Sequence, residues 1–182
     1  MLMTEKIDTV DALFVHELQD LRSAEEQLVS ALTKMAVAAD APELRAGLAR
    51  HLEQTRQQLR RVEQALSEIG EAPNDEVCYG IEGLIAEAEK LMSAASFGPV
   101  LDSALIDAAR KVEHYEITAY RATIAKAYDL GFKDVASLLE WNLQEEELID
   151  YRLQQLAEGL MPYSGPGSDP RDDGSEVIVG SN

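Results

Sequence analysis

The sequence predicts an all-α fold, in which four long helices form a bundle and an extra short helix lies between the second and third long helices. Three observations predict it. Alanine, leucine, glutamate and glutamine are abundant, and these residues lose little side-chain freedom in a helix. Aromatic residues make up only 5% of the chain, whereas sheets favour aromatic and β-branched side chains. Apolar residues also recur every three or four positions over long segments, which indicates helices that each bury one face.

The first two long helices are expected on either side of a proline. Thr9 can cap the first helix, which begins near Val10. Pro42 suits the first turn of the second helix, because the amide hydrogen that proline lacks would have no partner there. The apolar spacing then continues to Gly70, a residue type that commonly ends helices.

The short helix and the last two long helices are separated by glycine and proline. A turn at Pro73 precedes the short helix, which is expected over about 77–94. The sequence Phe-Gly-Pro at 97–99 then interrupts the chain. The third long helix is expected over about 100–128 and the fourth over about 133–159.

Charge and cysteine content limit the possible functions. A formal net charge of -18 opposes nucleic-acid binding, because an acidic surface repels phosphate. Cys78 is the single cysteine, so no internal disulfide can form, which fits a reducing compartment. The N-terminal residues do not resemble a secretory signal, and no apolar run is long enough to cross a bilayer. We therefore expect a cytoplasmic protein that binds neither nucleic acid nor membranes.

Every long helix has ionisable residues within or beside its apolar stripe. A carboxylate in such a place is costly unless something pairs with it. The residues in question are Glu17 and Asp20 in the first helix, His51 in the second, Glu116 in the third, and Glu146 and Asp150 in the fourth. Carboxylates with one imidazole suit iron or manganese better than a thiolate site would. Four-helix bundles are known to hold two such ions with carboxylate ligands.

Some of these candidates also have an interpretation without metal. His51 could be a histidine at the edge of the core that bonds to a neighbouring side chain. Glu17 and Asp20 could instead pair with a cation such as Arg22 or Arg121.

Other acidic residues are expected to face solvent. Glu113 projects away from the apolar stripe, so a surface salt bridge is the simplest expectation for it. Asp150 could accept a hydrogen bond from Tyr120. The residues expected to be solvated helix charges are Glu25, Glu145 and Glu147.

Several segments resemble one known family. They are HELQDLRSAEEQL at 16–28, HLEQTRQQLRRVE at 51–63, CYGIEGLIAEAEK at 78–90, ALIDAARKVEHYEITAY at 104–120 and LQEEELIDYRL at 143–153. These segments look like the corresponding blocks of the YciF-type stress proteins, the DUF892 branch of the ferritin-like superfamily. The resemblance covers about residues 9–160, and KVEHYEI is its most distinctive piece.

This resemblance implies a ferritin-like, rubrerythrin-like bundle that forms a homodimer and holds a di-metal site of iron or manganese. The residues that match polar positions of the family are Asp20, His51, Glu113, Glu116, Glu146 and Asp150, and Glu17 is compatible with them. The ligand role of Glu113 rests on the resemblance alone.

Two departures from related proteins bear on activity. The family often has glutamate where this chain has Gln54, which removes one possible ligand. Catalytic ferritin-like sites also use Glu-x-x-His pairs, and no histidine here has glutamate three residues before it. Metal binding is therefore better supported than turnover.

The leading hypothesis is a stress-related protein that binds two iron or manganese ions and, if active, oxidises Fe(II) or reduces peroxide. The alternative is a structural or interaction bundle without metal, whose buried acids are satisfied by hydrogen bonds. A storage cage is disfavoured by the inserted short helix and the missing Glu-x-x-His ligands.

The chain is expected to divide into a bundle domain at 1–161 and a flexible tail at 162–182. The tail is rich in glycine, proline, serine and aspartate and contains the apolar run Val177–Val179. It resembles the peptides that dock ferritin-like cargo into encapsulin shells. The alternative is an unstructured end without a partner.

Overall fold

The computed structural model describes residues 6–160, and this part of the chain forms five helices and no strands. The helices are α1 (Val10–Ala38), α2 (Pro42–Glu68), α3 (Tyr79–Ala94), α4 (Pro99–Asp129) and α5 (Lys133–Leu160). The predicted all-α fold is confirmed, with α3 as the extra short helix. The predicted tail at 162–182 lies outside the described residues.

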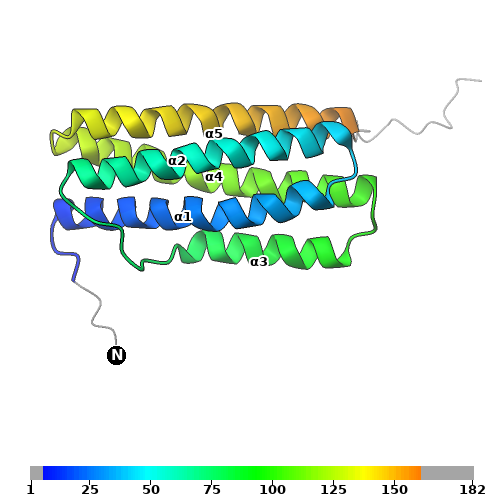
Figure 1. Cartoon of the computed structure of the whole chain (residues 1–182), viewed down its shortest axis with the longest axis horizontal. Helices are drawn as coiled ribbons and strands as arrows, with labels where there is room; N and C mark the ends of the chain where they lie inside the picture. The colour runs from blue at the N-terminus through cyan, green and yellow to red at the C-terminus, as the bar shows by residue number, and fades with distance from the viewer. Residues whose placement is uncertain (1–5, 161–182) are drawn as a thin grey trace, which may run out of the picture.

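The four long helices lie side by side with α3 on the outside of the bundle (Figure 1). α1 packs mainly on α2, and α4 packs mainly on α5, because a short turn joins the two members of each pair. The two hairpins meet where α2 packs on α5 and where α1 packs on α4. α3 packs on α4 and α1. No helix within residues 6–160 is long and apolar enough to cross a membrane.

Local chemistry explains where the helices begin and end. The Thr9 hydroxyl accepts a hydrogen bond from the amide of Ala12 at 3.1 Å, which caps α1 as predicted. Pro42 is the first residue of α2. Gly70 and Gly131 follow the ends of α2 and α4 with φ values of 82° and 86°, a conformation that other residues rarely adopt.

The buried carboxylate of Asp102 joins two parts of the bundle. It accepts hydrogen bonds from the amides of Asp40 and Ala41 at 2.8 and 2.9 Å. These amides belong to the turn between α1 and α2, whereas Asp102 lies in the first turn of α4. The contact fixes the α1–α2 turn against the start of α4.

Two apolar clusters lie mainly within the four long helices with polar residues between them, and a third cluster joins α3 to α1 and α4. One cluster includes Leu32, Leu48, Leu105, Ile149 and Leu153. The other includes Phe14, Leu18, Leu66, Ile124 and Leu139. Between them along the helices lie buried polar side chains, which we call the polar band: Glu25, His51, Gln58, Glu113, Glu116, Tyr120, Asn142 and Glu146. All four long helices contribute to this band.

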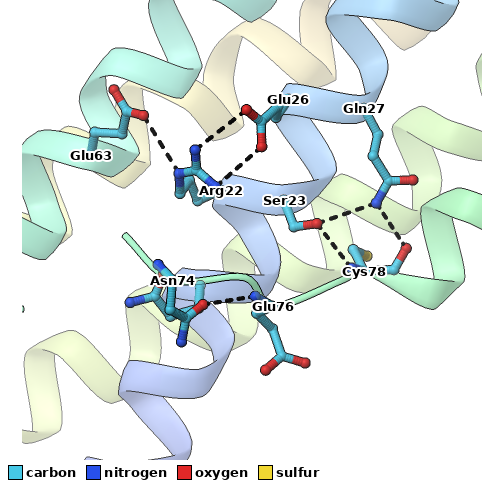
Figure 2. Close-up of polar contacts among 9 residues, drawn as sticks. Arg22, Ser23, Glu26, Gln27, Glu63, Asn74, Glu76 and Cys78 are labelled. Atoms are coloured by element: carbon cyan, nitrogen blue, oxygen red, sulfur yellow. Dashed lines mark hydrogen bonds and ion pairs between the residues drawn. The ribbon is translucent and has the colours of Figure 1, made fainter. Parts of the chain in front are cut away.

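An extended segment, residues 71–78, connects α2 to α3 and is held to α1. Gln19 donates to the carbonyl of Ala72 at 2.8 Å. Ser23 accepts from the amide of Cys78 at 3.0 Å, and Gln27 donates to the Cys78 carbonyl at 3.2 Å (Figure 2). Since Gln19, Ser23 and Gln27 are four residues apart, they form one stripe along α1.

Candidate metal centre

Four glutamates lie in the middle of the bundle with almost no contact with solvent. Glu25, Glu113 and Glu146 are 0% exposed, and Glu116 is 1% exposed. α1 provides the first, α4 provides Glu113 and Glu116, and α5 provides Glu146. Each belongs to a helical stripe whose other members are apolar, so folding of the apolar clusters carries the carboxylates into the interior.

His51 from α2 completes the most compact group. Its Nε2 atom lies 3.0 Å from Oε1 of Glu113. Potential ligand atoms of His51, Glu113 and Glu146 all lie within 4.8 Å of one another. Three different helices therefore bring two carboxylates and one imidazole to a single point.

Neutral side chains bind two of the other carboxylate oxygens. Gln58 donates from Nε2 to Oε1 of Glu146, and the Tyr120 hydroxyl donates to Oε1 of Glu25. Asn142 lies near both donors. Its side-chain amide donates to the Tyr120 hydroxyl oxygen at 2.9 Å and to the main-chain carbonyl of Gln58 at 3.3 Å.

The remaining carboxylate oxygens have no partner. Oε2 of Glu25, Glu113 and Glu146 and both oxygens of Glu116 are buried without a hydrogen bond. Within residues 6–160, no lysine or arginine forms an ion pair with any of these four glutamates. Arg61, whose charge acts on Glu25, is bound to Glu145 instead. Buried oxygens of this kind are costly unless a proton or a cation binds them.

Burial changes the protonation of the whole group. It raises the pKa of Glu25, Glu116 and Glu146 well above the ordinary value, and neighbouring glutamates add to the effect. Burial also raises the pKa of Glu113 to about 7. The pKa of His51 is lowered, again because burial disfavours the charged form. In the absence of a cation, the carboxyl groups thus retain protons that ordinary glutamates lose.

Three predicted ligands lie outside the compact group and have other partners. Glu17 is 2.9 Å from Nζ of Lys126 and accepts a bond from Thr123, so the cation expected from Arg22 or Arg121 comes from Lys126. Asp20 accepts from the Tyr115 hydroxyl at 3.5 Å.

Asp150 is the third of these residues. It accepts hydrogen bonds from Arg110 at 2.8 Å and His114 at 3.2 Å, so the expected bond from Tyr120 was wrong. Burial opposes ionisation of Asp150, but the bonds from Arg110 and His114 outweigh it and lower its pKa.

Two expectations about exposure were also wrong. Glu25 was expected to be solvated and Glu113 to form a surface salt bridge, yet both are completely buried. Their spacing contains the signal that could have placed them inside. Glu25 continues the series Leu18, Leu21 and Leu28, and Glu113 lies four residues after Ala109. This spacing places both residues within their apolar stripes.

A surface groove of about 600 Å³ lies beside α1 and segment 71–78. Arg22 lines it and forms ion pairs with Glu26 at 3.1 Å and Glu63 at 3.5 Å (Figure 2). The groove shares no lining residue with the polar band. The candidate centre is therefore the buried group and not this groove.

Comparison with known proteins identifies the family. Residues 9–163 match a family described as "Domain of unknown function (DUF892)". The chain belongs to the DUF892 family. Among its curated relatives, protein YciF of Escherichia coli K12 is 40% identical over 150 residues, which is 82% of this chain and 90% of YciF.

Solved structures of other proteins share the fold. The E. coli stress protein YciF matches with a TM-score of 0.82 and 39% identity, covering 85% of this chain and 98% of that one. YcfI of Rhodopseudomonas palustris, described as a putative structural protein, matches with a TM-score of 0.81 and 37% identity, covering 84% and 98%. A Xanthomonas campestris protein matches in fold alone, with a TM-score of 0.67 and 23% identity over 83% and 92%.

Proposed function

We propose that this DUF892 protein binds two divalent ions, iron or manganese, within the polar band. One observation carries the proposal. Five buried carboxylate oxygens have no hydrogen-bond partner, and no lysine or arginine in residues 6–160 pairs with the four glutamates to which they belong. A cation at this position would replace the missing partners and stabilise the ionised carboxylates.

The donor atoms suit these metals. Four carboxylates and one imidazole are the hard and borderline ligands that Fe(II) and Mn(II) accept. His51, Glu113 and Glu146 would hold the first ion. Glu25 and Glu116 would hold the second. Glu146 lies close enough for its charge to raise the pKa of both of these glutamates. Compared with the residues predicted from sequence, Glu25 is added. Glu17 and Asp150 are left out because each has a cationic partner, and Asp20 is left out because it lies outside the compact group and accepts a bond from Tyr115.

Burial determines how the side chains of the protein would contribute to metal binding. If bound, iron or manganese would supply the electrons that reduce peroxide or dioxygen. Glu113 releases its proton when a cation binds, and His51 is already neutral, so neither residue opposes binding above about pH 7. The apolar clusters at both ends of the band exclude water from the carboxylates.

The biological setting is proposed from the relatives. Because the E. coli relative is described as a stress protein, we place this chain in a stress response. The single cysteine and the family resemblance extend the proposal to a cytoplasmic homodimer. The proposed docking of the tail into an encapsulin shell is tested separately. Deletion of residues 165–182 would abolish co-purification with a shell protein, and unchanged co-purification would refute the docking.

Metal analysis tests the main proposal. The wild-type chain, reconstituted anaerobically with Fe(II) or Mn(II) and desalted, is expected to retain about two ions per chain. The double variant Glu116→Gln with Glu146→Gln should retain none, because it removes ligands from both ions. Glu147→Gln is the matched control, since Glu147 follows Glu146 in α5 but pairs with Arg121 at the surface. Retention of less than about 0.2 ions by the wild type would refute the proposal.

A second candidate function is a structural bundle without metal. The absence of the Glu-x-x-His pattern supports it, as does the description of the R. palustris relative as a putative structural protein. In this case the glutamates stay protonated and bind one another. The same metal analysis distinguishes the two functions, because a structural bundle remains folded and empty after reconstitution.

A further inference from the structure

Three neutral side chains lie buried beside the candidate ligands, and each donates a hydrogen bond to a candidate ligand or to a residue that does. They are Gln58 of α2, Tyr120 of α4 and Asn142 of α5, and each is 0% exposed. None of the three is a ligand in the proposed metal centre. Their position in the interior is costly unless their polar atoms are used.

Each of the three has a distinct contact. Tyr120 donates to Oε1 of Glu25, and Gln58 donates to Oε1 of Glu146. Asn142 donates to the Tyr120 oxygen and to the main-chain carbonyl of Gln58, so it hydrogen-bonds to the side chain of Tyr120 but only to the backbone of Gln58. Because the Asn142 amide occupies a lone pair of the phenol oxygen, the Tyr120 hydrogen is directed at Glu25.

The result for the two glutamates is the same. In each, one oxygen is bound by a neutral donor, and the other oxygen, Oε2, is buried without a partner. A neutral donor fixes the rotation of a carboxylate but leaves its negative charge intact. An arginine or lysine in the same place would fix it equally well but would repel a cation.

We infer that Gln58, Tyr120 and Asn142 act as a positioning clamp, which holds Glu25 and Glu146 so that one oxygen of each is presented to a divalent cation. The inference rests on the proposed metal binding and explains how the ligands are held before an ion arrives. It also assigns a role to Asn142, which hydrogen-bonds to neither glutamate and acts through Tyr120. Residues that orient ligands in this way commonly contribute ten- to hundred-fold to metal affinity.

Cobalt binding to the full chain tests the clamp. Co(II) affinity is measured by competition titration, and the visible absorption spectrum of bound Co(II) reports ligand geometry. Tyr120→Phe removes only the hydroxyl, so we expect affinity to fall by about ten- to hundred-fold and the spectrum to change. Tyr128→Phe is the matched control, because this tyrosine is exposed and its hydroxyl binds Glu140 at the surface.

A second variant separates positioning from general stability. Asn142→Leu should weaken binding in the same direction, and combining it with Tyr120→Phe should weaken binding little further, because Asn142 acts largely through Tyr120. Wild-type affinity and an unchanged spectrum in both single variants would overturn the clamp while leaving the proposed metal binding intact. A wild-type chain that binds neither Co(II) nor Mn(II) would overturn both.

Discussion

Glu113 shows how burial sets the charge of a single side chain. Its carboxyl group lies 3.0 Å from His51, yet burial raises its pKa to about 7 and lowers that of the histidine. An ordinary glutamate, with a pKa of 4.5, is ionised well below pH 7. Between these two values, the folded chain holds a proton at Glu113 that the unfolded chain has already released.

This difference predicts how the stability of the metal-free protein depends on pH. A raised folded-state pKa means that the contribution of Glu113 is fully present below about pH 4.5 and is lost as pH rises through about 7. Over this range the wild type should lose about 1.4 kcal/mol per pH unit relative to Glu113→Gln, which has no proton to lose. Urea denaturation in the presence of a chelator measures the free energy of unfolding of both proteins. The comparison with Glu113→Gln cancels the opposite contribution of His51, whose pKa is lowered. A constant difference between the two proteins from pH 5 to 7 would contradict the prediction.

α3 illustrates what one glycine permits at the scale of a helix. A Cβ atom on Gly80 would lie 2.5 Å from Cε2 of Tyr115, which is too close for any real contact. Gly80 therefore allows the ring of Tyr115 to pass beneath the first turn of α3 and to reach Cys78 at 3.3 Å. Ile81 and Ala88 are the buried residues of α3. The contact between Gly80 and Tyr115 therefore contributes much of the packing of this helix on the bundle.

Replacement of Gly80 should loosen α3. Gly80→Ala forces the helix or the Tyr115 ring to move, and we expect a loss of about 1–3 kcal/mol in the free energy of unfolding. Gly83→Ala lies in the same helix with no atom within 4 Å of the added Cβ, so it should be neutral or stabilise by up to about 1 kcal/mol. Chemical denaturation of both variants, with hydrogen exchange of α3, gives the comparison. Equal stability of the two variants would show that the close contact is not needed.

The turn between α1 and α2 depends on a carboxylate from α4. Asp102→Ala leaves the partly buried amides of Asp40 and Ala41 without their charged acceptor, so the free energy of unfolding should fall by about 1.5–3 kcal/mol. Asp107→Ala is a suitable control, because Asp107 is exposed on the same helix and should change stability by less than about 0.5 kcal/mol. Thermal and urea unfolding measure the effect. The prediction is wrong if the two variants unfold alike.

At the scale of the whole molecule, the polar band divides the core and weakens the metal-free bundle. Each end of the bundle has its own apolar cluster, and the four glutamates occupy the space between them. A ligand that binds only the folded protein should restore the stability that these groups cost.

Addition of Mn(II) should therefore raise the melting temperature of the chelator-treated protein. At a free concentration about 100 times Kd, the expected gain is about 2.7 kcal/mol, which corresponds to a shift of about 5–10 °C for a domain of this size. Calorimetry with and without the ion measures the shift, and excess chelator should reverse it. The variant Glu116→Gln with Glu146→Gln should show no shift, whereas Mg(II) on the wild type controls for ionic strength. A similar shift with Mg(II) would argue against a selective site.

Much of the helical architecture could be read from local sequence. The caps and breaks at Thr9, Pro42, Gly70 and Gly131 depend on a few neighbouring residues, and the helices begin and end close to them. The apolar period is also local, because side chains three and four residues apart share a face whatever lies opposite. Glu116 and Glu146 interrupt an apolar stripe and His51 flanks one, and all three are buried.

Local sequence thus indicates the helices, their order and the presence of acids on their inner faces. Which of these acids form the candidate centre depends on how the helices pack. Glu17 and Glu25 both lie at apolar spacing in α1, yet packing buries Glu25 completely and leaves Glu17 partly exposed. Glu17 and Asp150 found Lys126 and Arg110, cations whose proximity depends on packing. Charge compensation is a property of the space between helices, so periodicity within one helix could not predict it.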